Sequence, residues 1–190
     1  MKDSSQYAKK VQRLYRKLKR RAGKGAVLTY EEPVDALVYA VVSEKITESQ
    51  AESAIKKLKD NFVDFNDLRV ARPEEISEVL GQDFPFAHEI ATTLVTSLMA
   101  VFNKYNMLSL QGLRKLGKRP AKMMLEKLAG VTPFIVDYCM LTSMEGQEGF
   151  LSRQIAMKNA YEFYSLLRRE SESPKVSKSS KENKRKKRKG

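Results

Sequence analysis

The sequence predicts an all-helical protein. Apolar residues recur at spacings of three and four along most of the chain, and glycines and prolines stand where these periodic stretches begin and end. No stretch alternates apolar and polar residues in the manner of a half-buried strand. With 42% hydrophobic residues among 190, the chain can bury a sizeable core. We therefore expect two helical lobes and a polar C-terminal tail.

Five helices are predicted before residue 106. The first, residues 4–22, is amphipathic and basic, and the glycines after it permit the left-handed turn that ends a helix. The second begins at Pro33 and is apolar on nearly every side, so we expect it at the centre of the core. Thr47 is the predicted N-cap of the third. Pro73 opens a short helix, and a long one follows over 85–105.

A tight helical hairpin is predicted over residues 120–146, after a short leucine-rich element. Pro120 begins its first helix, Gly130 breaks that helix, and Thr132 with Pro133 starts the next as N-cap and first residue. A glycine turn before a helix start exposes backbone N–H groups at the positive end of the helix dipole, which suits a phosphate. An ordinary αα-hairpin without a ligand is the alternative.

Positive charge is concentrated in three places. The net charge is +13, but residues 1–25 hold ten bases and one acid, and residues 168–190 hold eleven bases and three acids. The segment between them is therefore net acidic. Within it, residues 104–127 carry seven bases against one acid, so the positive charge of the core is local. Such basic surfaces attract a duplex backbone independently of base sequence.

Composition also limits the possible chemistry. The single cysteine, Cys139, lies in an apolar run, which indicates a buried inert thiol and a reducing compartment. One histidine and one cysteine cannot form a structural zinc site. No apolar stretch is long enough to span a membrane, and no signal-peptide core follows the first residues. We expect an intracellular, DNA-associated monomer without membrane contact, located in the nucleus if the organism has one.

Two motifs carry a resemblance to a known family. Leu125-x-x-Leu128-Ala129-Gly130-Val131 resembles the L-x-x-L-P-G-V-G hairpin of the endonuclease III-like DNA glycosylases, the helix-hairpin-helix base-excision-repair superfamily. The segment from Pro33 to Glu48 is similar to the family's P-F-E-L-L-I … S-A-Q-A-T-D stretch, and the helix order agrees over about residues 5–165. The resemblance implies a helix-hairpin-helix glycosylase-like fold. It also implies that the backbone at Gly130 and Thr132 binds a phosphate, with a monovalent cation possible at the hairpin carbonyls.

The departures from the family pattern concern catalysis. Phe134 stands four residues after the motif glycine, where bifunctional members carry a Schiff-base lysine, and an apolar ring is no nucleophile. No carboxylate occurs at residues 150–153, where the family's catalytic aspartate would fall. The four cysteines of the family's iron–sulfur cluster are also missing, so we expect no such cofactor. Lys45 replaces a glutamine that fills the gap left by a flipped base, and lysine cannot make the same amide contacts.

Three functions remain open from the sequence. The leading one is a DNA-binding protein with a glycosylase fold that lacks the usual catalytic residues. The second is an active monofunctional glycosylase with a relocated carboxylate, for which the candidates are Asp137, Glu145 and Glu148. The third is a helical interaction module without DNA affinity. We read the chain as a basic N-terminal helix packed on the core (1–25), an endonuclease III-like helical domain (26–168) and a disordered basic tail (169–190). The candidate DNA contacts are Lys10, Arg13, Lys17, Lys45, Lys118, Arg119, Lys122, Lys127, Gly130, Val131 and Thr132.

Overall fold

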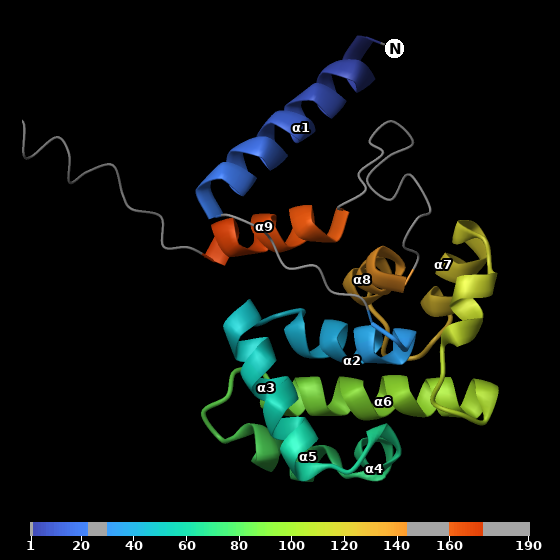
Figure 1. Ribbon diagram of the computed structural model, residues 1–190. Helices are drawn as coiled ribbons and strands as arrows, with labels where there is room; N and C mark the ends of the chain where they lie inside the picture. Colours follow the sequence, from blue (N-terminus) through green and yellow to red (C-terminus); the bar gives the residue numbers. More distant parts are fainter. Residues whose placement is uncertain (1, 23–29, 144–159, 173–190) are drawn as a thin grey trace, which may run out of the picture.

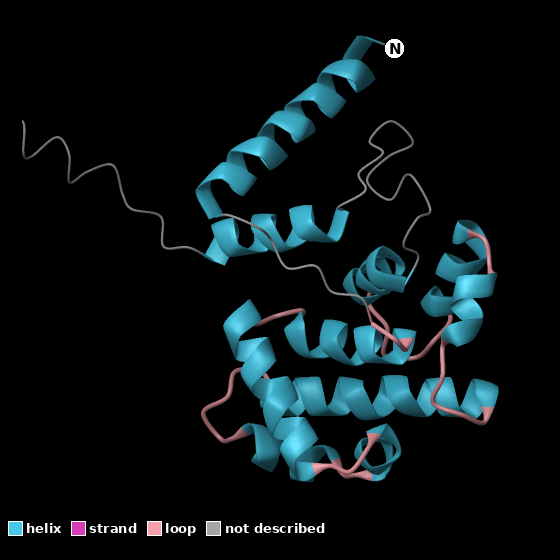
Figure 2. Ribbon diagram, in the orientation of Figure 1, coloured by secondary structure: helices cyan, strands magenta, loops and turns pink. Residues whose placement is uncertain are grey.

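The computed structural model describes residues 2–22, 30–143 and 160–172 (Figure 1). Helices and connecting loops make up all of these residues, and no strand occurs among them (Figure 2). The predicted all-helical class is thereby confirmed. The elements are α1 (Lys2–Ala22), α2 (Pro33–Ser43), α3 (Glu48–Asn61), α4 (Phe65–Val70), α5 (Pro73–Leu80), α6 (Ala87–Tyr105), the 3-10 helix η1 (Gln111–Lys115), α7 (Lys118–Glu126), α8 (Pro133–Ser143) and α9 (Ala160–Glu172).

Helix α2 lies at the centre of the larger of two hydrophobic cores. It packs on α8, α3 and α6, and its residues from Pro33 to Ser43 are buried except for Asp35 and Tyr39 (Figure 1). This burial follows from its sequence, because a helix that is apolar on all sides is stable only when neighbours cover it all round. Helices α4 and α5 pack on the other side of α6.

Local sequence signals explain most helix ends. Thr47 caps α3 as predicted, accepting a hydrogen bond from the Gln50 backbone while the Gln50 side chain accepts one from the Thr47 backbone. Gly81, at φ +108°, ends α5. Helix α4 is not among the predicted elements; Asp64 caps it by accepting from the N–H groups of Asn66 and Asp67. At six residues it is too short to show a clear period in the sequence.

Helices α1 and α9 form the smaller core. Leu18 packs with Phe163 and Leu166, and the ring of Tyr15 meets that of Phe163 edge-on with centroids 5.7 Å apart. The sequence predicts that the first helix packs on the helical domain without naming its partner, and the apolar side of α1 contacts α9. Glu162 is buried beside this core, where Lys19 and Tyr15 donate to its carboxylate. The second lobe is therefore built from segments about 140 residues apart in the chain.

Two boundaries differ from prediction. The long helix begins at Ala87 rather than Pro85, because Phe86 adopts a left-handed conformation with φ 60°. Helix α9 continues to Glu172, so residues 169–172, which the sequence assigns to the tail, are helical. An ion pair between Arg169 and Glu48, and a hydrogen bond from the Glu48 N–H to Glu172, hold this last turn against the start of α3. Residues 173–190, the remainder of the predicted tail, lie outside the described residues.

Cys139 is fully buried in α8, and burial raises the pKa of its thiol to about 12. This agrees with the inert thiol expected from its apolar neighbours. Among the helices that the structure describes, none is long and apolar enough to cross a membrane.

Candidate nucleic-acid interface

Helices α7 and α8 form the predicted hairpin, and a six-residue turn joins them. Lys127 ends α7, the N–H of Leu128 donates to Leu125, and the N–H of Val131 donates to the carbonyl of Leu128 over 3.3 Å. Gly130 then takes a φ of +75°, which reverses the chain before Pro133 opens α8. Glycine adopts a positive φ more readily than other residues, so the position of Gly130 in the sequence determines where the chain turns.

Gly130 also contacts helix α6. A Cβ atom added at this glycine would lie 3.2 Å from the Thr96 side chain and 3.3 Å from the Ser97 backbone nitrogen. The turn is thus pressed against the middle of α6, and its other side is exposed. Glycine is required here both for its backbone conformation and for the close approach of two chain segments.

Thr132 caps α8 and links the hairpin to α2. Its hydroxyl oxygen accepts a hydrogen bond from the N–H of Ile135 over 3.3 Å, and the hydroxyl donates to the carboxylate of Glu44 over 2.7 Å. Glu44 is the C-cap residue of α2. The predicted N-cap is confirmed, and its second bond places a carboxylate beside the start of α8.

Backbone donors remain unpaired at this helix start, among the residues that the structure describes. Within the part of the chain that the structure describes, the N–H groups of Gly130 and Thr132 have no protein acceptor. They lie at the positive end of the α8 dipole, where an anion's oxygens would be stabilised. The turn thus has the geometry of a phosphate site, apart from the nearby negative charge of Glu44.

Lys45, in the loop after α2, contacts the same side of α6 as the Gly130 turn does. It forms an ion pair with Glu89 at the start of α6, and its ammonium lies 5.8 Å from the centre of the Phe86 ring. Glu89 and Thr96, which contacts Gly130, are seven residues apart, or about two turns of one helix. The surface from Lys45 and Phe86 to Gly130 therefore runs along one side of α6. Phe86 is 51% exposed.

The predicted basic residues of the hairpin lie on α7. Lys122 is exposed and lies 3.8 Å from Asp137 and 3.9 Å from Glu126, so part of its charge is compensated. Arg119 and Lys127, together with Lys104 of α6, surround a shallow cavity of about 370 Å³ whose floor includes Met123 and Met124. Among the described residues, no acid lines that cavity. Lys118, the remaining basic residue predicted on this helix, is its first residue and is half-buried.

The predicted basic residues of α1 lie on the smaller lobe. Lys10, Arg13 and Lys17 are exposed and recur at spacings of three and four, which places them on one side of the helix. Leu18, which packs on α9, lies on another side of the helix. The docking of α1 thus fixes these cations on a surface, although on a different lobe from the hairpin (Figure 1).

A cleft of about 800 Å³ lies between the end of α2, the start of α8 and α9. Its walls include Phe134 and Tyr164 as apolar surface, and Glu44, Lys45 and Glu172 as charged groups. Asp137, one of the predicted carboxylate candidates, is not part of this wall; it faces Lys122 on the outer side of the hairpin. Glu145 and Glu148, the other two candidates, lie outside the described residues.

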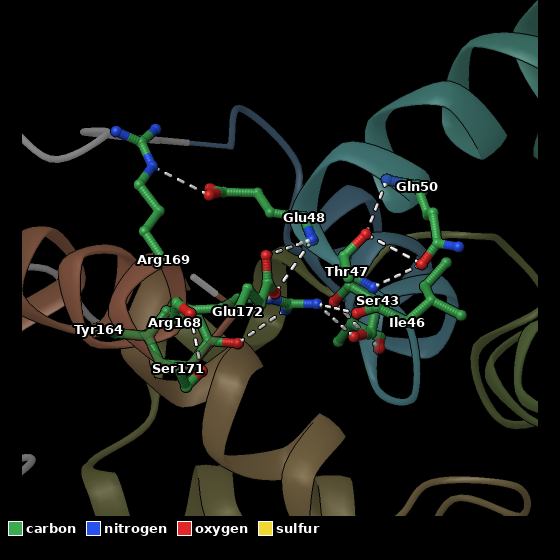
Figure 3. Close-up of polar contacts among 11 residues, drawn as sticks. Ser43, Ile46, Thr47, Glu48, Gln50, Tyr164, Arg168, Arg169, Ser171 and Glu172 are labelled. Atoms are coloured by element: carbon green, nitrogen blue, oxygen red, sulfur yellow. Dashed lines mark hydrogen bonds and ion pairs between the residues drawn. The ribbon is translucent and has the colours of Figure 1, made fainter. Parts of the chain in front are cut away.

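Arg168 of α9 joins the two lobes across this cleft (Figure 3). Its guanidinium donates to the backbone carbonyls of Ser43 and Ile46, and to the carboxylate of Glu172 over 2.8 Å. Glu172 in turn accepts from the N–H of Glu48, the first residue of α3, over 3.1 Å. A cation thus meets the negative end of α2 and an anion meets the positive end of α3, which helix dipoles favour.

Comparisons with known proteins support the fold. No family model matches the chain, and no curated protein matches it. Among solved structures, a non-covalent endonuclease III–DNA complex matches with a TM-score of 0.56 and 14% identity over 76% of this chain and 64% of that one. A trapped endonuclease III–DNA covalent intermediate, the estranged-adenine complex, matches with a TM-score of 0.54 and 14% identity over 72% of this chain and 60% of that one.

The chain has an endonuclease III-like fold. The match spans less than two thirds of the length of both endonuclease III chains. Phe134 stands where the sequence resemblance implies a nucleophilic lysine, and it lines the cleft. Its ring packs 6.2 Å from that of Tyr138, so the position is part of an aromatic cluster.

Sequence reasoning missed three residues of this region. Glu44 lies directly before Lys45 in the segment that resembles the family's S-A-Q-A-T-D stretch, but that stretch has an alanine at its position and so gives no reason to single it out. Phe86 falls within the range predicted for a helix, and only its φ of 60° and its exposure distinguish it. Arg168 stands at the edge of the predicted tail, and no local pattern in the sequence marks it. The described residues contain no group of three or more His, Cys, Asp or Glu that could hold a metal.

Proposed function

We propose that this protein binds duplex DNA, with a phosphate at the α7–α8 turn and further contacts from Lys45, Phe86 and the basic side of α7. The observation that carries the proposal is the Gly130 turn, where the N–H groups of Gly130 and Thr132 have no acceptor among the described residues and lie at the N-terminus of α8 in an endonuclease III-like fold. Contacts to phosphates position a protein on DNA without reading bases. We therefore expect strong salt dependence and little sequence preference.

Charge reversal tests this proposal. Lys127→Glu and Arg119→Glu should each weaken binding of a fluorescent duplex, measured by anisotropy, and reduce the slope of log K against log salt by about one. Lys56→Glu is the matched control, because Lys56 is exposed on α3, across the molecule from α7, and changes the net charge equally (Figure 1). Equal effects of all three variants would indicate non-specific attraction and refute a localised interface.

Glu44 favours a second candidate function, a monofunctional DNA glycosylase. A carboxylate in a cleft beside the hairpin is the feature that such an enzyme needs to stabilise the sugar cation as the bond to a flipped base breaks. In that reaction water adds to the sugar carbon and the free base leaves. With Phe134 in place of a lysine, no Schiff base forms and the DNA strand stays intact.

One substitution separates the two functions. Glu44→Gln keeps the shape and the hydrogen bond of Thr132 but removes the negative charge beside the proposed phosphate site. A pure binding protein should then bind duplexes more tightly and release no base before or after the change. A glycosylase should release base from at least one duplex in a panel of damaged bases, and Glu44→Gln should abolish that release. The proposal includes no iron–sulfur cluster, and it retains the predicted monomer.

A further inference from the structure

A third cavity, of about 600 Å³, lies toward the other end of α2 from the cleft. It is bounded by Tyr30, the first turns of α2, the C-terminal half of α3 and the start of α4. Helix α2 has 11 residues and is therefore about 16 Å long, so the cavity is separate from the proposed DNA interface. Its volume is typical of sites for small organic molecules or single peptide side chains with their backbone.

Aromatic rings and aliphatic side chains form the walls of this cavity. Tyr30, Tyr39, Phe62 and Phe65 are half-buried around it, and buried aliphatic residues such as Leu58 close its floor. Tyr39 is held in place by stacking on Tyr138 with centroids 5.5 Å apart. The faces of such rings carry partial negative charge and attract cations.

Carboxylates outnumber cations at the same cavity. Among the described residues, Glu31, Asp35 and Asp64 line it against a single ammonium, that of Lys59, which leaves an excess of two negative charges in a chain whose net charge is +13. Burial raises the pKa of Asp35 and Lys59 opposes this, so the carboxylate is partly desolvated and only partly compensated. Backbone N–H groups of Asp67 and Asn66 lower the pKa of Asp64, which keeps it ionised.

We propose that this cavity binds an organic cation, namely a methylated ammonium group on an apolar stem. Aromatic walls and carboxylates together favour such a group over its competitors. A phosphate or a nucleic acid would be repelled by the acids, a metal ion would find aromatic rings in place of most of its ligands, and a neutral apolar molecule would leave the acids uncompensated. The cation would gain both ring contacts and a carboxylate partner.

A pair of shape-matched compounds tests the proposal on the full chain. Acetyl-trimethyllysine amide and its tert-butyl isostere, in which carbon replaces the charged nitrogen, are titrated by calorimetry and by NMR. We expect the charged compound to bind roughly ten-fold more tightly than the neutral one, as cation–aromatic attraction predicts. Equal affinity of the two, or no saturation by either, would overturn the proposal. Choline serves as a third probe: tight binding of choline identifies a free quaternary amine as the ligand, and weak binding identifies a methylated side chain.

Variants locate the site and control for misfolding. Asp35→Asn should weaken binding of the charged compound, whereas Lys59→Gln should strengthen it severalfold by removing the competing cation. A gain of affinity does not arise from unfolding, so Lys59→Gln keeps the test valid if Asp35→Asn is unstable. Lys56→Gln, on the same helix but not lining the cavity, should leave affinity unchanged. Weaker binding by Lys59→Gln would refute the site. Because this cavity is independent of the hairpin, none of these compounds should displace duplex DNA.

Discussion

The hydroxyl of Thr132 donates a hydrogen bond of 2.7 Å to the carboxylate of Glu44, which lies 88 residues earlier in the chain. This bond fixes the start of α8 against the end of α2. It also brings Glu44 next to the proposed phosphate site. Among the described residues, Glu44 is the only one whose side-chain carboxylate is bonded to the hairpin turn. Thr132 therefore has two roles, as a helix cap and as the link that orients Glu44.

Substitutions of Thr132 should show whether its hydroxyl or its methyl group stabilises the protein. Thr132→Val keeps the side-chain shape but loses both hydrogen bonds, so we expect the free energy of unfolding to fall by about 1 kcal/mol or slightly more. Thr132→Ser retains the hydroxyl and should lose much less. Urea denaturation of both variants measures the difference, and equal losses would mean that the methyl group, not the hydroxyl, matters.

Gly130→Ala should destabilise the protein by about 1–2 kcal/mol, because φ is +75° and the new Cβ would be only 3.2 Å from Thr96. Gly112 provides the matched control. It has an ordinary φ, and a Cβ placed there meets nothing within 4 Å, so Gly112→Ala should change stability by less than about 0.5 kcal/mol. Thermal unfolding of the two variants checks this, and similar melting temperatures would contradict the left-handed conformation of Gly130.

Arg168→Met should loosen the contact between α9 and the loop after α2. The Arg168 side chain is only 11% exposed and donates to two backbone carbonyls, so its loss leaves buried acceptors unpaired. We expect a cost of about 2 kcal/mol. Arg169→Gln breaks a more exposed ion pair with Glu48 and should cost well under about 1 kcal/mol. Hydrogen exchange would report the change, with faster exchange confined to α9 and α1 for Arg168→Met. Uniform acceleration over all helices would argue against a local role.

Glu89→Gln should strengthen duplex binding severalfold at low salt, because it releases Lys45 from its ion pair and removes a negative charge near the proposed interface. Glu52→Gln, an equal change of charge on α3, is the control and should have a smaller effect. Anisotropy titrations at two salt concentrations provide the measurement. If Glu89→Gln binds no better than Glu52→Gln, Lys45 does not contact DNA.

Cys139 should resist thiol reagents at neutral pH until the protein unfolds, because burial raises the pKa of its thiol to about 12. The unfolded thiol loses its proton near about pH 8.5, whereas the folded one keeps it. The unfolded state thus binds fewer protons between about pH 9 and pH 12, and stability falls as pH rises through that range, by up to about 1.4 kcal/mol per pH unit. Cys139→Ala should lack this contribution in urea denaturation at pH 8 and pH 10. Rapid labelling of the native protein would disprove the burial.

Helix ends were predictable because their causes are local. Thr47, Pro73, Gly81 and Gly130 act through the backbone within three or four residues, so a single sequence suffices to place them. Phe86 is the exception. A bulky residue rarely adopts a left-handed conformation, and no local rule anticipates it at this position.

The sequence by itself determined the all-helical class, the hairpin turn at Gly130, the cap at Thr132 and the burial of Cys139. Only the tertiary structure decided that α1 packs on α9, that Glu44 rather than Asp137 lines the cleft, and that Arg168 bridges to Ser43 across 125 residues. The physical reason is the separation along the chain of the residues that interact. Caps, turns and periodic apolar faces depend on neighbouring residues, whereas ion pairs and hydrogen bonds between distant segments exist only after the hydrophobic faces have fixed how the helices pack.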